Sequence, residues 1–177
     1  MPELKGSGIH VVQLKNTSAT TVNWQSCIEI EITGTASPKF LKSGDILFVA
    51  RGNNNYAVLV DSSINTSKMV AAPHFYIIRT NTDKVLPQFL VWLLNQKPIQ
   101  QCFKREAEGT LAKSIRRSVL ENVEVILPSL DEQHKVAQLT STIQRQQDTY
   151  QQLIDNGNQI MSTIAYQLHN RKEIRKP

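Results

Sequence analysis

A short polar segment, Arg51-Gly52-Asn53-Asn54-Asn55, carries closely spaced forked hydrogen-bonding side chains. Arg presents several N–H donors in one plane, and Asn presents a donor beside an acceptor. These groups can bind base edges in a bidentate way, Arg to guanine and Asn to adenine. Because the segment follows the apolar run Ile46–Ala50, we expect a loop after a buried strand. The alternative is a solvated hairpin tip whose asparagines merely suit turn geometry.

A second group of polar residues is basic and suits binding to phosphate. It comprises Lys104-Arg105 and Lys113-Ser114-Ile115-Arg116-Arg117, the densest basic cluster before the last third of the chain. The alternative is an ordinary charged surface, offset by Glu106 and Glu108. Lys39 and Lys68 are weaker candidates on other loops.

The sequence carries few patterns typical of catalysis or metal binding. The sequence has no methyltransferase motif of the Asn-Pro-Pro-Tyr type, no glycine-rich cofactor loop and no P-loop. Cys27 and Cys102 lie far apart, and the four histidines are scattered without metal-ligand spacing. We therefore expect a non-catalytic protein that uses no cofactor and no metal. A small enzyme with an unrecognised Cys102/His74 pair is the remote alternative.

Composition is consistent with a folded, modestly basic protein. The 177 residues are 40% hydrophobic and 20% charged, with a net charge of +5 and a pI near 9.3. This balance fits a polyanionic partner, although many proteins with it bind no nucleic acid. The N-terminal residues lack the apolar run of a signal peptide, and no stretch is long enough for a membrane span. We expect a cytoplasmic protein without membrane association.

Short strand-like runs and two helices alternate up to Pro128. This pattern predicts an α+β domain with a mixed sheet over residues 1–128. The expected helices are Leu86–Asn95, with Pro87 in its first turn, and Pro98–Arg105. The expected strands are Ile9–Leu14, Cys27–Ile32, Ile46–Ala50, Tyr56–Val60, Phe75–Arg79 and Val123–Leu127.

The last third of the chain reads as one long helical arm over residues 129–172, followed by a basic tail, 173–177. Ser129 offers an N-cap, and no proline interrupts the pattern up to Arg171. A hairpin with its turn at 155–157 is the alternative, but the heptad phase holds across Gly157 and favours one helix. Apolar residues alternate at spacings of three and four, as in a coiled-coil seam that needs a partner; they are Val136, Leu139, Ile143, Tyr150, Leu153, Ile160 and Ile164.

Four motifs occur together in one order. Leu41-Lys42-Ser43-Gly44-Asp45-Ile46-Leu47 is followed by Arg51-Gly52, then by the segments 69–79 and 86–94, and lastly by 125–133, which reads VILPSLDEQ. Each motif alone is weak, but the order and spacing are specific. Together they resemble the specificity (S) subunits of type I restriction-modification systems, over roughly Ile9 to Leu168.

The resemblance implies a DNA target-recognition domain followed by a helical spacer arm. Full-length S subunits carry two such domains, and their arms form an antiparallel coiled coil. One domain and one arm here imply a half-length form that pairs as a homodimer. Such a dimer would read a bipartite inverted repeat in double-stranded DNA and recruit methyltransferase (M) and restriction (R) subunits. The alternative is a stand-alone homodimeric DNA-binding or regulatory protein.

For such a domain, the polar segments become candidate DNA contacts. Arg and Asn would read bases, and the basic cluster would meet phosphates. The arm glutamines Gln144, Gln147, Gln151 and Gln152 could face the methyltransferase or simply solvent. The DNA candidates are Arg51, Asn53, Asn54, Asn55, Lys68, Lys104, Arg105, Lys113, Ser114, Arg116 and Arg117.

Overall fold

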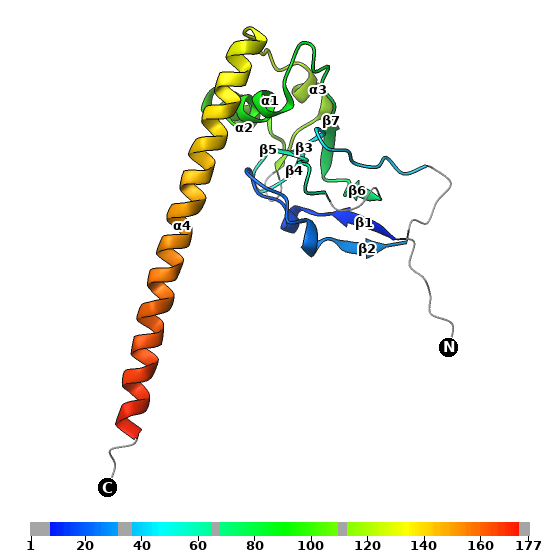
Figure 1. Cartoon of the computed structure of the whole chain (residues 1–177). Coiled ribbons are helices and arrows are strands. Elements are labelled where there is room, and N and C mark those ends of the chain that lie inside the picture. Colours follow the sequence, from blue (N-terminus) through cyan, green and yellow to red (C-terminus); the bar gives the residue numbers. More distant parts are fainter. Residues whose placement is uncertain (1–7, 32–36, 65–67, 110–112, 174–177) are drawn as a thin grey trace, which may run out of the picture. The chain divides into compact units, whose positions relative to one another are not determined.

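The computed structural model of the chain describes residues 8–31, 37–64, 68–109 and 113–173. The chain divides into two units, Met1–Ala137 and Gln138–Pro177. The first unit holds all the strands (Figure 1), and the second belongs to the long helix α4. The fold is α+β, as the sequence predicts, while the predicted domain boundary at residue 128 stays a prediction.

The central strand of the first unit is β3 (Ile46–Val49), and it is buried on both faces. It pairs antiparallel with β5 (Ala57–Leu59) and β7 (Phe75–Ile78). Because side chains alternate along a strand, β3 supplies two separate cores. Phe48 packs among the helices on one side, while Leu47 packs toward the other sheet. The strands predicted over Ile46–Ala50 and Tyr56–Val60 therefore form, as β3 and β5, and pair with each other.

A second three-stranded sheet has the order β2-β1-β6 and is mixed. β1 (Ile9–Val12) pairs antiparallel with β2 (Ile28–Ile30) and parallel with β6 (Met69–Ala71). The alternating run that predicts β2 does form a strand, but Ile28 remains 45% exposed. Ile32, the last residue of that predicted strand, lies outside the described part.

Three short helices cover the second core. α1 (Pro87–Leu94) and α2 (Lys97–Glu106) agree with the two predicted helices, and each has a proline in its first turn. Phe103 of α2 lies against Phe48 of β3, with ring centroids 4.9 Å apart. α3 (Arg117–Glu121) was not predicted, because its residues read as the end of a polar loop.

The strand predicted over Val123–Leu127 is wrong. This segment has no regular structure, and Ile126 is 89% exposed. An apolar run forms a strand only where another strand supplies hydrogen-bonding partners. No strand in the described part of the chain pairs with residues 123–127.

The long helix α4 (Leu130–Glu173) is continuous through Gly157, so the single-helix prediction is confirmed and the hairpin alternative is wrong. Its first turn has a capping box: Glu132 accepts the Ser129 N–H at 3.0 Å, and Ser129 Oγ accepts the Glu132 N–H at 3.3 Å. No helix in the described ranges is long and apolar enough to cross a membrane.

Gln133 fastens the start of α4 to the first unit. Its side chain is completely buried. The Oε1 atom accepts the Leu86 N–H at 2.9 Å, and Nε2 donates to the carbonyls of Lys84 and Pro128, each at 3.0 Å. The first turn of the arm therefore shares a polar network with the loop that leads into α1.

Candidate nucleic-acid interface

A two-stranded ribbon brings together the two polar segments that the sequence singles out. β4 (Arg51–Gly52) pairs antiparallel with β8 (Lys113–Ser114), so Arg51 lies opposite Ser114. The ribbon is anchored at one end, where the Ile115 N–H, just after β8, donates to the carbonyl of Ala50, just before β4, at 2.8 Å. Because Ile115 is fully buried, this anchor is fixed by the core.

An open groove of about 590 Å³ lies beside β4. Its lining includes Gly52, where an added Cβ would come within 3.2 Å of Val49 Cγ1. A larger residue at position 52 would therefore crowd the Val49 side chain. The lining residues are Leu14, Lys15, Val49, Arg51, Gly52, Asn53, Asn54, Tyr56 and His74.

The polar side chains around this groove are available for a ligand. Arg51, Asn53 and Asn54 are exposed, as are Lys15 and His74. Within the described residues, no carboxylate pairs with Arg51 or Lys15. The groove thus gathers two cations, two amides and an imidazole with no acidic residue in its lining.

Asn55 has a different environment from the other candidates in its loop. It is buried, and its Nδ2 donates to the carbonyl of Val49 at 2.9 Å and to that of Ala50 at 3.4 Å. These bonds close the turn between β3 and β5. We therefore omit Asn55 from the proposed interface, since its amide is engaged inside the domain.

Tyr56 holds the neighbouring wall of the groove in place. Its hydroxyl donates to the Thr17 carbonyl at 2.9 Å, at the end of the short 3-10 helix η1 (Leu14–Asn16). This contact ties η1, and with it Lys15, to the β3–β5 turn. Sequence reasoning missed Lys15 and His74, because only strand pairing and this contact bring their segments beside Arg51.

The basic cluster is partly neutralised. Arg116 is ion-paired with Glu108, and Arg117 Nε lies 2.7 Å from Glu121 Oε1. Arg105 Nε lies 3.3 Å from Glu106 Oε1. Lys104 and Lys68 are exposed at other places on the domain. Residues 110–112 and the Lys113 side chain lie outside the described part.

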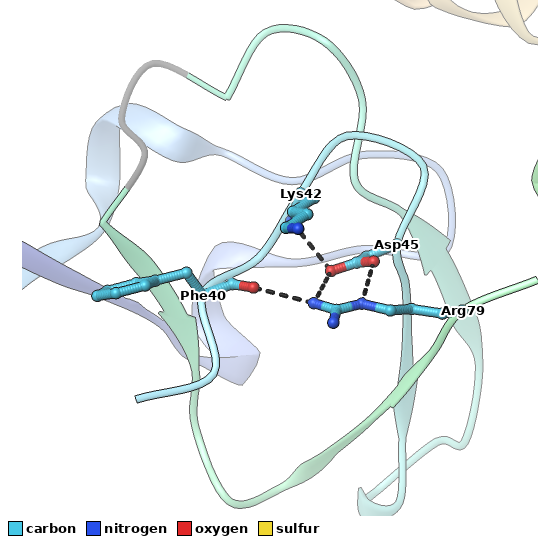
Figure 2. Close-up of polar contacts among 4 residues, drawn as sticks. All are labelled: Phe40, Lys42, Asp45 and Arg79. Carbon is cyan, nitrogen blue, oxygen red and sulfur yellow. Dashed lines mark hydrogen bonds and ion pairs between the residues drawn. The ribbon is translucent and has the colours of Figure 1, made fainter. Parts of the chain in front are cut away.

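The turn before β3 is set by an ion pair that Figure 2 shows. Asp45 accepts Arg79 Nε at 2.8 Å on one carboxylate oxygen, and Arg79 Nη2 and the Lys42 N–H, each at 3.0 Å, on the other. Arg79 also donates to the Phe40 carbonyl. The hydrogen bonds and charge of Asp45 raise the pKa of the Arg79 guanidinium. Gly44 precedes at a φ of +91°, which favours glycine.

The arm presents the predicted apolar seam on its surface. Leu139, Tyr150, Leu153 and Ile160 are each at least 60% exposed, and Ile143 and Ile164 are 45% and 43% exposed. Val136, in the first unit, is half-buried. Two arm glutamines bond along the helix, Gln144 to Asp148 at 2.8 Å and Gln151 to Asp155 at 2.9 Å.

Two solved structures share this fold. The HsdS subunit from Thermoanaerobacter tengcongensis matches with a TM-score of 0.62 and 21% identity, over 82% of this chain and 38% of that one. A second match belongs to a study of complex assembly and conformational transition in a type I R-M system. Its TM-score is 0.63 and its identity 22%, over 81% of this chain and 37% of that one.

This chain therefore spans well under half the length of the chains it resembles. No curated protein matches it. A family model described as "Type I restriction modification DNA specificity domain" matches residues 9–156, which is most of the chain. The protein belongs to the family of type I restriction-modification DNA specificity domains.

Proposed function

We propose that this chain is a sequence-specific DNA-binding specificity subunit of a type I restriction-modification system. The observation that carries the proposal is the groove beside β4, which unites Lys15, Arg51, Asn53, Asn54 and His74 in a domain of this family. Positive and neutral donors without lining carboxylates suit a polyanion that also displays base-edge acceptors.

The groove residues divide into two kinds of contact. Arg51, Asn53 and Asn54 have forked ends that can distinguish bases. Lys15 is a point charge on a flexible stem and suits a phosphate. Ser114, in strand β8 of the ribbon, and the nearby residue Arg116 would extend the phosphate contacts. In this proposal the chain itself binds DNA, and its partners supply any methylation or cleavage.

The arm is the element that would pair two copies. Its exposed apolar seam needs a partner, and a second copy offers the same seam. A two-fold dimer presents two identical domains and hence reads an inverted repeat with a constant gap. Beside the seam, Ile154 and Met161 are also exposed and offer a surface for a methyltransferase subunit, with restriction subunits joining the same assembly.

Modification mapping in a host that carries this chain with its cognate methyltransferase tests the proposal. A methylated inverted repeat with a fixed gap is expected, and it should disappear when Arg51 and Asn53 are both replaced by Ala. Replacing Lys97 and Asn122 by Ala is the matched control, since both are exposed and lie outside the groove lining. An unchanged methylation pattern in the host that carries the Arg51/Asn53 double variant would overturn the DNA-reading role. Failure to co-purify with the methyltransferase would favour a stand-alone DNA-binding protein.

A further inference from the structure

We propose that two copies of this chain pair through antiparallel arms in one register, centred between Gln151 and Gln152. The proposal rests on the homodimer proposed above and deepens it by specifying the partner's position. Its basis is the pattern of large, small and polar residues along the exposed seam of one continuous helix.

Between Leu139 and Ile164 the seam has two interruptions, and they differ in size; a third, Gln167, lies beyond this stretch. Gln146 is a long polar residue and Gly157 has no side chain, while the seam residues around them are large and apolar. Nothing lies within 4 Å of a Cβ built on Gly157, so the surroundings in a single chain do not require this glycine. A facing helix would meet a gap at Gly157 and a bulky polar group at Gln146.

Antiparallel pairing about the proposed centre places these interruptions opposite each other. Gln146 of one copy then faces Gly157 of the second copy, so the long side chain fills the gap that the glycine leaves. Three further layers are apolar on both sides: Leu139 with Ile164, Ile143 with Ile160, and Tyr150 with Leu153, each formed twice by symmetry. At each end of the seam, Val136 faces the polar residue Gln167.

Neighbouring registers fit less well. A shift of one heptad toward the N-terminus sets Leu139 against Gly157 and Tyr150 against Gln146. A shift toward the C-terminus sets Leu153 against Gly157 and Ile164 against Gln146. Both leave cavities or bury an amide against apolar side chains, which is costly.

Parallel pairing is also less favourable. It stacks Gly157 on Gly157, which leaves a void in the seam, and it aligns the two helix dipoles. In the proposed antiparallel register, the acidic residues at 131–132 come level with the basic positions 171–172 of the sequence. The size pattern and the charge pattern therefore select the same arrangement.

The register also sets the distance, along the shared helix axis, between the two residues at which the arms join the first units. Ala137, the last residue of the first unit, lies level with position 166 of the second copy. At 1.5 Å per residue, the two Ala137 residues are about 44 Å apart along the shared axis.

Cysteine pairs test the register directly, in a chain whose half-buried native thiols Cys27 and Cys102 are replaced by Ser. The variant Ile143→Cys with Ile160→Cys should form a covalent dimer on mild oxidation. These positions are about 25 Å apart within one helix, so an intrachain bond is impossible. The control Ile143→Cys with Leu153→Cys matches the register shifted toward the N-terminus and should stay largely uncrosslinked. Preferential crosslinking of the control, or of Ile143→Cys alone, would overturn the register.

Spin labels outside the seam keep the test valid if seam substitutions weaken pairing. Ser141 and Ser162 are exposed, lie outside the seam and are equally far from the proposed centre. Each is replaced by Cys and labelled. Each labelled dimer should show about 32 Å between labels along the axis, in addition to the interhelical spacing. The N-terminally shifted register instead gives about 21 Å for Ser141 and about 42 Å for Ser162. In a parallel dimer each label would lie level with its copy, so both labelled dimers would show only the interhelical spacing.

The outcomes separate the register from the function. A dimer with unequal label distances would overturn the register and leave the homodimer standing. A single-chain mass at micromolar concentration would overturn both the pairing and its register. Neither result bears on the groove, whose role is decided by the modification pattern.

Discussion

Arg51 and Ser114 lie opposite each other across β4 and β8, although they belong to distant parts of the sequence. This pairing turns two separate polar segments into one surface beside the groove. Each segment alone resembles a solvated loop, and it is their proximity, together with Lys15 and His74, that indicates a binding site.

Replacing Arg51 by Ala should relax specificity at one position of each half-site, because a forked donor to a base is lost. The expected loss of affinity for the mapped target is about 5- to 150-fold, with little change for random DNA. Equilibrium binding to targets substituted at each position measures this. Lys97→Ala is the control, since Lys97 is exposed and lies outside the groove lining. An equal loss on all sequences would contradict base reading by Arg51.

Replacing Lys15 by Ala should weaken binding to all DNA sequences alike, because a phosphate contact carries no sequence information. The slope of log K against log salt should fall in magnitude by about 0.9 for one lost contact. Titrations at several salt concentrations measure it, with the exposed residue Lys97→Ala as the comparison. An unchanged slope would remove Lys15 from the interface.

Replacing Gln133 by Ala should destabilise the first unit and loosen the start of the arm. The Leu86 N–H and two carbonyls would lose their partner in a buried place. The free energy of unfolding should fall by about 1–3 kcal/mol. Urea unfolding measures this, and Gln138→Ala, at an exposed position on the same helix, should cost far less. Equal costs for the two variants would show that the buried network contributes little.

Replacing Asp45 by Ala removes the acceptor for Arg79 and for the Lys42 N–H. We expect a loss of about 1–3 kcal/mol in the free energy of unfolding, moderated because the Arg79 side chain is 53% exposed. Thermal and urea unfolding test this against Asp83→Ala, which alters an exposed carboxylate. A loss no larger than the control's would rule out a structural role for the pair.

The capping box at α4 has a pH signature. Hydrogen bonds from the Ser129 hydroxyl and N–H lower the pKa of Glu132. The stabilisation is therefore present above the ordinary glutamate pKa and is lost as pH falls through the lower folded value. Ser129→Ala should raise the pKa of Glu132 toward its ordinary range, as measured by carboxyl NMR titration. An unchanged titration midpoint would contradict this account.

Local pattern alone determined much of this protein. The seam from Leu139 to Ile164 and the helix that begins at Pro87 have apolar residues at helical spacing. Ile46–Ala50 is a short apolar run after a turn signal, and its length and position favour a buried strand. The heptad phase across Gly157 was enough to predict a continuous arm. The ordered motifs were enough to predict the family, because each matches a structural feature, such as the turn at Asp45 or the arm start at Gln133.

Tertiary structure decided the site. Asn55 and Asn54 are identical and adjacent, yet one side chain is bonded inside the turn and the other lines the groove. Lys15 and His74 join Arg51 because strand pairing and the Tyr56 hydroxyl hold their segments together. Val123–Leu127 has a strand-like sequence and no strand beside it. In each case the outcome depends on partners distant in sequence, which a local pattern does not contain.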